Sequence, residues 1–293
     1  MTSAPYDKAL FDSLAGLRFA FRGRHRGRFE GLHASPRAGV SLEFADYRDY
    51  CPGDDIRYVD WRVLGRLNRA VVKTFVREED VPISVLVDLS ASMGIGSPAK
   101  SEVAARLAVA ISYVALKEFD RVGLYPFSDA LHPPLPPRHG MRQLARIVQA
   151  LRDATPGGGT SIDEALGAFA GQSRENGLVF VLSDFLTERG WREGLLRLLH
   201  RGDQVVAVQI LDSEDLQPLV EGIAQLVDAE TNRSIELTVG PATRMQYRKL
   251  LESRIQELEQ FAVGHRVTHF VVPTDLPIRV LFHEMFRRNG VLA

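Results

Sequence analysis

The stretch VLVDLSASMG, residues 85–94, places one carboxylate and two hydroxyls where an apolar run comes to an end. It continues the run ISVLVDLS, residues 83–90, whose length and β-branched side chains are typical of a strand buried on both faces. Asp88, Ser90 and Ser92 follow one another at alternate positions. Polar side chains in this place either satisfy a turn or bind a ligand.

The residues after this stretch alternate between strand and helix patterns. Strands are predicted over 83–90, 121–128, 177–185, 203–211 and 267–273, and helices over 100–119, 141–154, 161–174, 191–200, 242–261 and in a terminal segment ending at 288. Continuously apolar strands separated by helices indicate a mostly parallel sheet with helices on both faces, a Rossmann-like α/β fold. Ligands bind such sheets beyond the carboxyl ends of the strands, where Asp88 is expected.

Two parts of the chain do not show this alternation of strand and helix patterns. Residues 6–22 have the apolar spacing of an amphipathic helix, and residues 31–80 are rich in glycine and aromatic side chains and end in a β-branched strand pattern. We expect residues 1–80 to form an N-terminal helix and a small β-rich segment, and residues 81–293 to form the main domain. A hairpin pattern interrupts the main domain, so we interpret residues 212–240 as an insertion.

The bulk composition excludes several classes of protein. The chain has 293 residues, 45% of them hydrophobic, and a net charge of -1, so no global field attracts nucleic acid or acidic lipid. The basic run from Arg22 to Arg28 lacks interleaved aromatic side chains, and we favour a solvated helix end. Cys51 is the single cysteine, and the sequence contains neither an apolar leader nor a membrane span. We therefore expect a cytoplasmic protein with no nucleic-acid partner.

Small oxygen-bearing side chains occur at three predicted edges of the sheet. The first group is Asp88, Ser90 and Ser92; the second is the loop PGGGTS, which delivers Thr160 just before a helix; the third is Asp184, at the end of another apolar strand. Each group alone has a simple structural explanation, because serine, threonine and aspartate are common caps of helices and turns. Together they form an oxygen-only set, and hard divalent cations such as Mg²⁺ or Mn²⁺ prefer oxygen ligands.

This order of residues resembles the metal-ion-dependent adhesion site of von Willebrand factor A domains. The resemblance rests on Asp-x-Ser-x-Ser, a later threonine in a glycine-rich loop, and a still later Ser-Asp after an apolar strand. It implies that Ser90, Ser92 and Thr160 bind the metal directly, and that Asp88 and Asp184 do so mainly through water. It also implies that a carboxylate of a partner protein completes the coordination.

The segment EFADYRDYCPGDDIRYVDWRVLGRLNRAVVKTFVREED, residues 43–80, closely resembles the motif of the bacterial domain-of-unknown-function family 58. The matching residues are Tyr50, Pro52, Gly53, Asp54, Arg57, Asp60, Trp61, Arg77 and Glu78. Members of this family look like partners of MoxR-type AAA+ ATPases, which act in remodelling or maturing other proteins. Within the motif we favour a structural role, with Pro52 and Gly53 forming a turn, the charged residues forming a local network, and Trp61 packing.

The sequence therefore predicts a non-enzymatic adaptor that binds Mg²⁺ or Mn²⁺ and docks a MoxR-type ATPase or its client. The alternative is a metal-dependent hydrolase of phosphate esters with Asp88 as its nucleophile. Ser90 stands two residues on, where such a hydrolase needs a second carboxylate for acid/base catalysis. The run from Gly94 to Ala99 formally matches a dinucleotide-binding G-x-G-x-x-A, but Asp88 to Met93 separate it from the strand and Pro98 interrupts it.

Overall fold

The computed structural model describes residues 8–21, 27–29, 42–54, 56–77, 81–173, 175–187, 190–216 and 222–293. These residues form two compact units, a smaller one within 23–80 and a larger one that contains residues 8–21 and everything from 81 onward. The predicted boundary at residue 81 coincides with the boundary between the units. The N-terminal helix, however, belongs to the larger unit, because Leu14 is buried in its core and the ring of Phe11 lies 4.4 Å from that of Tyr113.

A six-stranded sheet forms the centre of the larger unit, with the order β11-β8-β7-β4-β5-β6. Its strands are β4 (Pro82–Asp88), β5 (Arg121–Phe127), β6 (Leu135–Arg138), β7 (Leu178–Ser183), β8 (Gln204–Leu211) and β11 (Thr268–Pro273). All neighbours are parallel except β5 and β6, which are antiparallel. The prediction of a mostly parallel sheet is confirmed.

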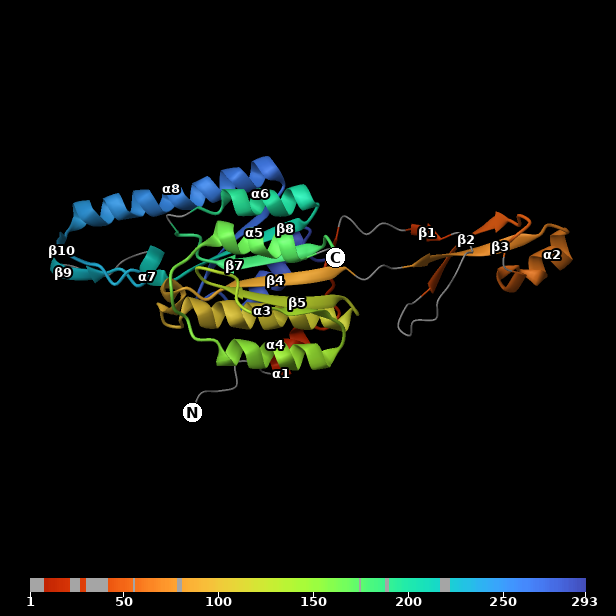
Figure 1. Ribbon diagram of the computed structural model, residues 1–293, viewed down its shortest axis with the longest axis horizontal. Helices are drawn as coiled ribbons and strands as arrows, with labels where there is room; N and C mark the ends of the chain where they lie inside the picture. The colour runs from red at the N-terminus through yellow and green to blue at the C-terminus, as the bar shows by residue number, and fades with distance from the viewer. Residues whose placement is uncertain are drawn as a thin grey trace. The chain divides into compact units, whose positions relative to one another are not determined.

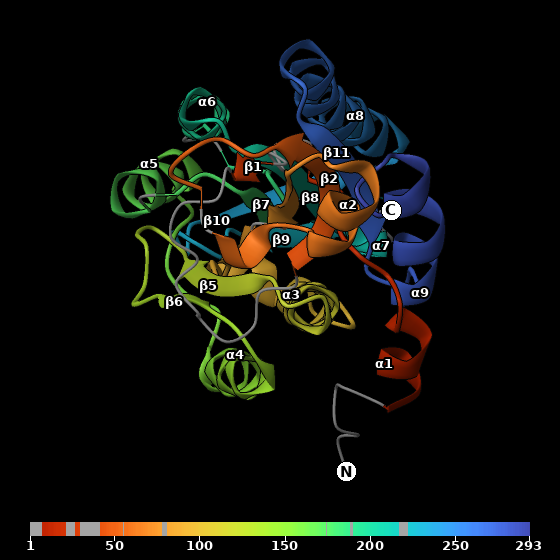
Figure 2. The ribbon, with the colours of Figure 1, turned by 90° about the vertical axis from the view of Figure 1, so that its right-hand side faces the viewer.

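Helices cover both faces of this sheet (Figures 1 and 2). They are α1 (Lys8–Leu14), α3 (Lys100–Lys117), α4 (Met141–Asp153), α5 (Ile162–Gln172), α6 (Arg192–Arg201), α8 (Pro241–His265) and α9 (Ile278–Val280), the last continued by a π-helical turn over Leu281–Phe286. Alternate residues of β4 point to opposite faces. Val85 and Val87 pack with α3 and α4 in one core, whereas Leu86 packs with α5 and α6 in the other.

Two elements differ from the prediction for physical reasons. Helix α1 ends at Leu14 instead of continuing to residue 22, and Gly16 follows it with a φ of +81°. The short strand β6 was absent from the prediction because Pro136 and Pro137 suppress the strand pattern. Prolines are tolerated there because β6 is the edge of the sheet.

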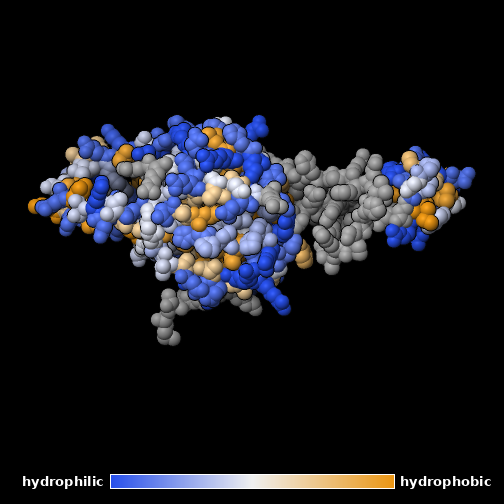
Figure 3. All heavy atoms as spheres, viewed as in Figure 1, coloured by the Kyte–Doolittle hydropathy of each residue, from blue (hydrophilic) through white to orange (hydrophobic). Residues whose placement is uncertain are grey.

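The insertion forms a separate two-stranded hairpin. Strands β9 (Gly222–Val227) and β10 (Ser234–Val239) pair in antiparallel register, and the short helix α7 (Ser213–Leu216) precedes them. Several apolar side chains of the hairpin are exposed, among them Ile223 at 76% and Ile235 at 61%, and the corresponding end of the molecule is partly orange in Figure 3. In Figure 1 the hairpin and α7 lie beyond the end of the sheet toward which β4 runs.

The smaller unit contains the antiparallel sheet β1-β3-β2, formed by Gly27–Phe29, Val71–Arg77 and Leu42–Asp49, together with the helix α2 (Trp61–Leu67). Asp60 caps α2, since its Oδ1 accepts from the amide of Arg62 at 2.9 Å and its Oδ2 accepts from the hydroxyl of Tyr47 at 3.0 Å. Asp54 forms an ion pair with Arg48 at 2.7 Å. Both motif aspartates thus have local structural roles within this unit.

Trp61 and Glu78 are the two motif residues whose outcome differs from the rest. Trp61 was expected to pack, but its side chain is 63% exposed because it lies at the start of α2, a helix without buried residues. Glu78 lies outside the described residues, as do the basic residues 22–26. In the part of the chain that the structure describes, no helix combines the length and the apolar character needed to span a bilayer.

We predict that Gly177→Ala strongly destabilises the larger unit. Gly177 leads into β7, and an added Cβ would lie 2.0 Å from the backbone oxygen of Pro82 at the start of β4. The backbone must shift, so we expect a loss of about 3 kcal/mol of unfolding free energy, measured by urea denaturation. Gly171 in α5 is the matched control, because nothing lies within 4 Å of its added Cβ and alanine favours a helix. Equal stability of the two variants would contradict this packing.

Candidate functional site

The site lies where the order of strands reverses. The chain passes from β4 to β5 on one side and later returns to β7 on the other, so β4 and β7 are parallel neighbours. Asp88 ends β4 and Asp184 directly follows β7. A reversal of this kind separates the connecting loops and leaves a place for a ligand beyond the strand ends. The topology thus brings the first and third predicted groups to one edge of the sheet.

Asp88 is fully buried, and both of its carboxylate oxygens accept hydrogen bonds. Oδ1 accepts from the amide of Ser90 at 2.8 Å, and Oδ2 accepts from the hydroxyl of Ser183 at 2.6 Å. Burial and the nearby charge of Asp184 raise the pKa of Asp88 to about 6, although these hydrogen bonds act in the opposite direction. Two carboxylates therefore interact unfavourably in a place with little water, which favours binding of a cation.

Ser90 and Ser92 lie together, and the structure shows neither of the helix caps expected at Ser90 and Ser161. The hydroxyls of Ser90 and Ser92 are 3.1 Å apart. Ser90 precedes the 3₁₀ turn over Ala91–Gly94 without capping it, and Ser161 precedes α5 without capping it. Ser90 is fully buried, and its contact with Ser92 keeps both hydroxyl oxygens at this edge of the sheet.

The glycine-rich loop packs against the loop after β4. The amide of Gly157 donates to the carbonyl of Leu89 at 2.8 Å, and the amide of Ala91 donates to the carbonyl of Gly158 at 3.1 Å. These bonds place Thr160, which is 2% exposed, beside the serine loop. All five residues predicted for the metal site, Asp88, Ser90, Ser92, Thr160 and Asp184, therefore lie in loops that meet at one edge of the sheet.

Two charged residues that the sequence analysis missed complete the surroundings. The ammonium of Lys100 lies 2.7 Å from Asp184 and 3.1 Å from Asp215 of α7. Burial lowers the pKa of Lys100, but the two carboxylates outweigh this effect and raise it above its ordinary value. One signal was available in the sequence, because a lysine at the start of a helix faces the positive end of the helix dipole and needs a compensating charge.

The second missed residue is Glu230, in the turn of the hairpin β9–β10. Its Oε2 accepts from the amide of Thr160 at 3.0 Å, and its Oε1 accepts from the hydroxyl of the same residue. Nothing in the sequence distinguishes Glu230 from an ordinary exposed turn residue. Its contact with the site follows from the position of the insertion.

The donor set fits a hard divalent cation. Among the described residues, no group of three or more His, Cys, Asp or Glu side chains forms a metal site on its own. The set found here is of another kind, with two buried carboxylates and three hydroxyls, and oxygen ligands of this type suit Mg²⁺ or Mn²⁺. The adjacent serine hydroxyls and the mutual repulsion of Asp88 and Asp184 are the observations in favour.

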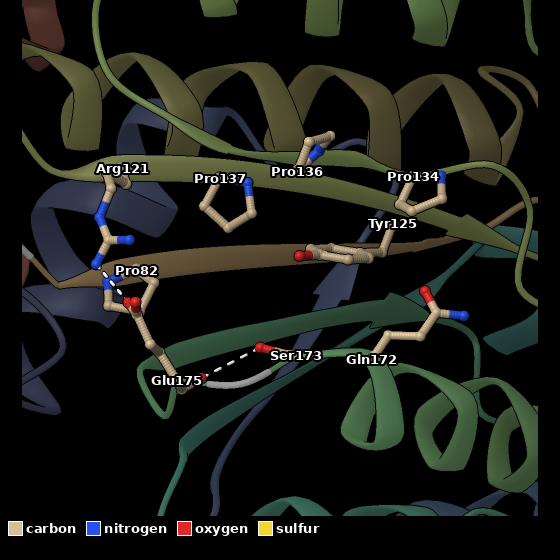
Figure 4. Close-up of a pocket in the computed structure, with 9 residues that line it drawn as sticks. All are labelled: Pro82, Arg121, Tyr125, Pro134, Pro136, Pro137, Gln172, Ser173 and Glu175. Carbon is tan, nitrogen blue, oxygen red and sulfur yellow. Dashed lines mark hydrogen bonds and ion pairs between the residues drawn. The ribbon is translucent and has the colours of Figure 1, made fainter.

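Two further features of the described residues bear on a site for a nucleotide or substrate. The segment from Gly94 to Ala99 forms a turn closed by a bridge between Gly96 and Ala99, and not a phosphate-binding turn at the end of a strand. A pocket of about 250 Å³ lies near the amino ends of β4 and β5, lined by residues such as Pro82, Arg121 and Tyr125 (Figure 4). None of the five predicted site residues lines it.

Hydrogen bonds through Gln209 link His269, in the outermost strand β11, to the backbone of Asp184. Gln209 of β8 is fully buried, and its amide donates to the carbonyl of Asp184 at 2.9 Å. Its carbonyl lies 3.2 Å from Nε2 of His269 in β11. Burial lowers the pKa of His269 to about 4, so the ring is neutral at pH 7. Gln209 thus holds the backbone of Asp184 in place.

We predict that Lys100→Met destabilises the protein by roughly 3 kcal/mol in the presence of EDTA. The substitution leaves the carboxylates of Asp184 and Asp215 without their ammonium, and breaking a buried ion pair has a cost of this order. Urea denaturation gives the measurement. Lys249→Met removes an exposed lysine of α8 and serves as the control, with an expected change below about 0.5 kcal/mol. Similar losses in both variants would contradict the role given to Lys100.

We also predict that His269 makes the protein sensitive to acid. Its pKa is about 4 in the folded protein and about 6.5 in the unfolded chain, so below pH 6.5 the unfolded chain binds a proton that the folded protein does not. Stability is lost as the pH falls from 6.5 to 4, by up to about 3 kcal/mol. His269→Gln removes this part of the dependence. Parallel stability profiles of the two proteins down to pH 4 would refute it.

The chain is similar to several bacterial proteins and solved structures. It is 27% identical over 294 aligned residues to uncharacterized proteins of Mycobacterium tuberculosis and Mycobacterium bovis, with 98% of this chain and 92% of each relative covered. Among solved structures, BatB from Bacteroides thetaiotaomicron has 19% identity and a TM-score of 0.40, over 62% of this chain and 99% of BatB. An aerotolerance-related membrane protein from Bacteroides fragilis has 16% identity and a TM-score of 0.44, over 71% and 99%.

Most of the chain also matches a known protein family. The model of the family described as "Protein of unknown function DUF58" matches residues 46–257. The match begins in the smaller unit, continues through the sheet edge that carries Asp88, Thr160 and Asp184, and ends within α8. The chain therefore belongs to the DUF58 family.

Proposed function

We propose that this protein is a non-enzymatic, metal-dependent protein-interaction module with a site of the von Willebrand factor A type. Asp88, Ser90, Ser92, Thr160 and Asp184 would hold Mg²⁺ or Mn²⁺, and a carboxylate of a partner protein would complete the coordination. The observation that carries the proposal is the meeting of these five oxygen side chains at the strand reversal, with buried Ser90 free of any capping role. The bound cation would supply a positive charge that recognises a carboxylate.

The partner that we propose is a MoxR-type AAA+ ATPase or its client. This part of the proposal is supported by the resemblance of the segment 43–80 to the family motif and by the family membership. The exposed Trp61 on α2 gives the smaller unit an aromatic side chain that is available for contact with another protein. We propose that the metal site and the smaller unit each offer a surface to a protein partner.

The hydrolase alternative has less support. Asp88 would have to attack a phosphorus atom, yet it has no exposed surface and both of its oxygens accept hydrogen bonds. A nucleophile needs an accessible lone pair directed at the substrate. Turnover of p-nitrophenyl phosphate by the wild type, lost in Asp88→Asn, would favour the hydrolase over the adaptor.

Isothermal titration with Mg²⁺ and Mn²⁺ tests the metal site directly. We expect binding by the wild type and an affinity lower by about tenfold or more in Ser90→Ala and Asp88→Asn, since each variant loses an oxygen ligand or its charge. Asparagine is preferred to alanine at position 88 because it can still accept from the amide of Ser90. Ser173→Ala, at the far end of α5, is the control that leaves the affinity unchanged.

A pull-down with tagged protein tests the partner. We expect a MoxR-type ATPase, identified by mass spectrometry, to be retained by the wild type in Mg²⁺ and lost with Ser90→Ala under the same conditions. The variant matters because EDTA also removes the metal from the ATPase. Absence of metal binding together with undiminished capture by Ser90→Ala would refute the proposal.

A further inference from the structure

The insertion contacts the candidate metal site at two points, and both contacts involve residues of the predicted metal set. At its tip, Glu230 accepts hydrogen bonds from the backbone and the side chain of Thr160. At its base, Asp215 of α7 shares the ammonium of Lys100 with Asp184. The hairpin therefore contacts Thr160 directly through a carboxylate, and α7 is linked to Asp184 through Lys100.

The turn of the hairpin is braced so that Glu230 is held in position. Oδ1 of Asp228 accepts from the amides of Glu230 and Thr231, each at 2.8 Å. The amide of Asn232 donates to the carbonyl of Asp228 at 2.9 Å, and Asn232 adopts the left-handed conformation with a φ of 57°. Asparagine tolerates this conformation, so the turn has a defined shape.

The carboxylate of Glu230 lies directly on the glycine-rich loop. An added Cβ at Gly159 would lie 3.6 Å from Oε2 of Glu230, an ordinary contact distance, which shows that the carboxylate lies against this loop. Thr160 is the residue of this loop with a hydroxyl in the metal set. When the hydroxyl oxygen of a threonine binds a metal, its proton still needs an acceptor, and Glu230 already provides one.

Four carboxylates and one ammonium lie around the site. The carboxylates of Asp88, Asp184, Asp215 and Glu230 gather here, with the ammonium of Lys100 between two of them. Fixed acidic groups in partly buried surroundings are stabilised when a cation joins them. Glu230 adds negative charge at Thr160, and among the described residues it forms no ion pair, so a cation bound beside Thr160 would balance its charge.

We propose that Glu230 is an internal carboxylate ligand of this site, held by the hairpin in the place that a partner's carboxylate would take. This inference rests on the proposed metal-binding function. It makes the hairpin a tethered competitor, because a carboxylate on the same chain acts at a high effective concentration. A partner would then have to displace Glu230, and the hairpin with it, before its own carboxylate could bind.

The experiment uses the full chain with Mn²⁺ and compares Glu230→Gln with Glu236→Gln. Glu236 lies in β10 of the same hairpin and is exposed, so its variant has the same change of charge without the contact with Thr160. We expect Mn²⁺ affinity, measured by titration, to fall about tenfold in Glu230→Gln and to stay unchanged in Glu236→Gln. Hydrogen exchange at residues 228–234 should slow on addition of Mn²⁺ in the wild type and in Glu236→Gln only.

Acetate serves as the probe for an outside carboxylate. With Mn²⁺ bound, we expect acetate to displace water from the metal of Glu230→Gln, seen as a fall in water-proton relaxation, and to leave the wild type and Glu236→Gln unaffected. Equal Mn²⁺ affinity and equal acetate response in all three proteins would overturn the role of Glu230 while leaving the metal site intact. If the wild type binds no Mn²⁺, the proposed function itself fails, and the role of Glu230 as a metal ligand fails with it.

Discussion

The ion pair between Lys100 and Asp184 fixes how charge is arranged at the centre of the molecule. Asp184 is buried because β7 lies inside the sheet, and an isolated carboxylate in that place would be strongly unfavourable. Lys100 resolves this by entering from the start of α3, which therefore has to begin beside the sheet edge. The apolar face of α3 packs across β4, and the start of the helix thereby brings Lys100 to this edge of the sheet.

The same ion pair bears on the strength of metal binding. Part of the negative charge of Asp184 is already balanced by Lys100, so a divalent cation gains less from this carboxylate than from an unpaired one. Asp88 has no such partner among the described side chains, and its raised pKa reflects that difference. A cation in the proposed site would therefore be held weakly, and an additional carboxylate would strengthen its binding.

Much of the architecture could be predicted because strand and helix patterns have different periods. Apolar runs such as residues 83–90 and 177–185 marked the buried strands to within two or three residues. The set of five site residues was also visible, because each stands at the end of such a strand or in a glycine-rich loop. Strand β6 was missed because its local composition contradicts its role, and only the antiparallel pairing with β5 explains it.

The contacts between distant segments could not be predicted in the same way. Ser183, Lys100 and Glu230 contact the site residues across separations of 95, 84 and 70 positions in the chain. No periodicity links residues so far apart, and Glu230 stands in a polar turn like many others. Trp61 was expected to pack because a tryptophan is usually buried, whereas in the structure it is 63% exposed and α2 has no buried residue.

The prolines of β6 affect whether a strand of a second molecule can pair with this edge of the sheet. Pro136 and Pro137 have no amide hydrogen, and because successive amides of a strand point to opposite sides, one of the two removes a donor from the outer edge of β6. A sheet with an open edge can recruit strands from neighbouring molecules and aggregate. Proline at this edge therefore disfavours growth of the sheet on the side of β6.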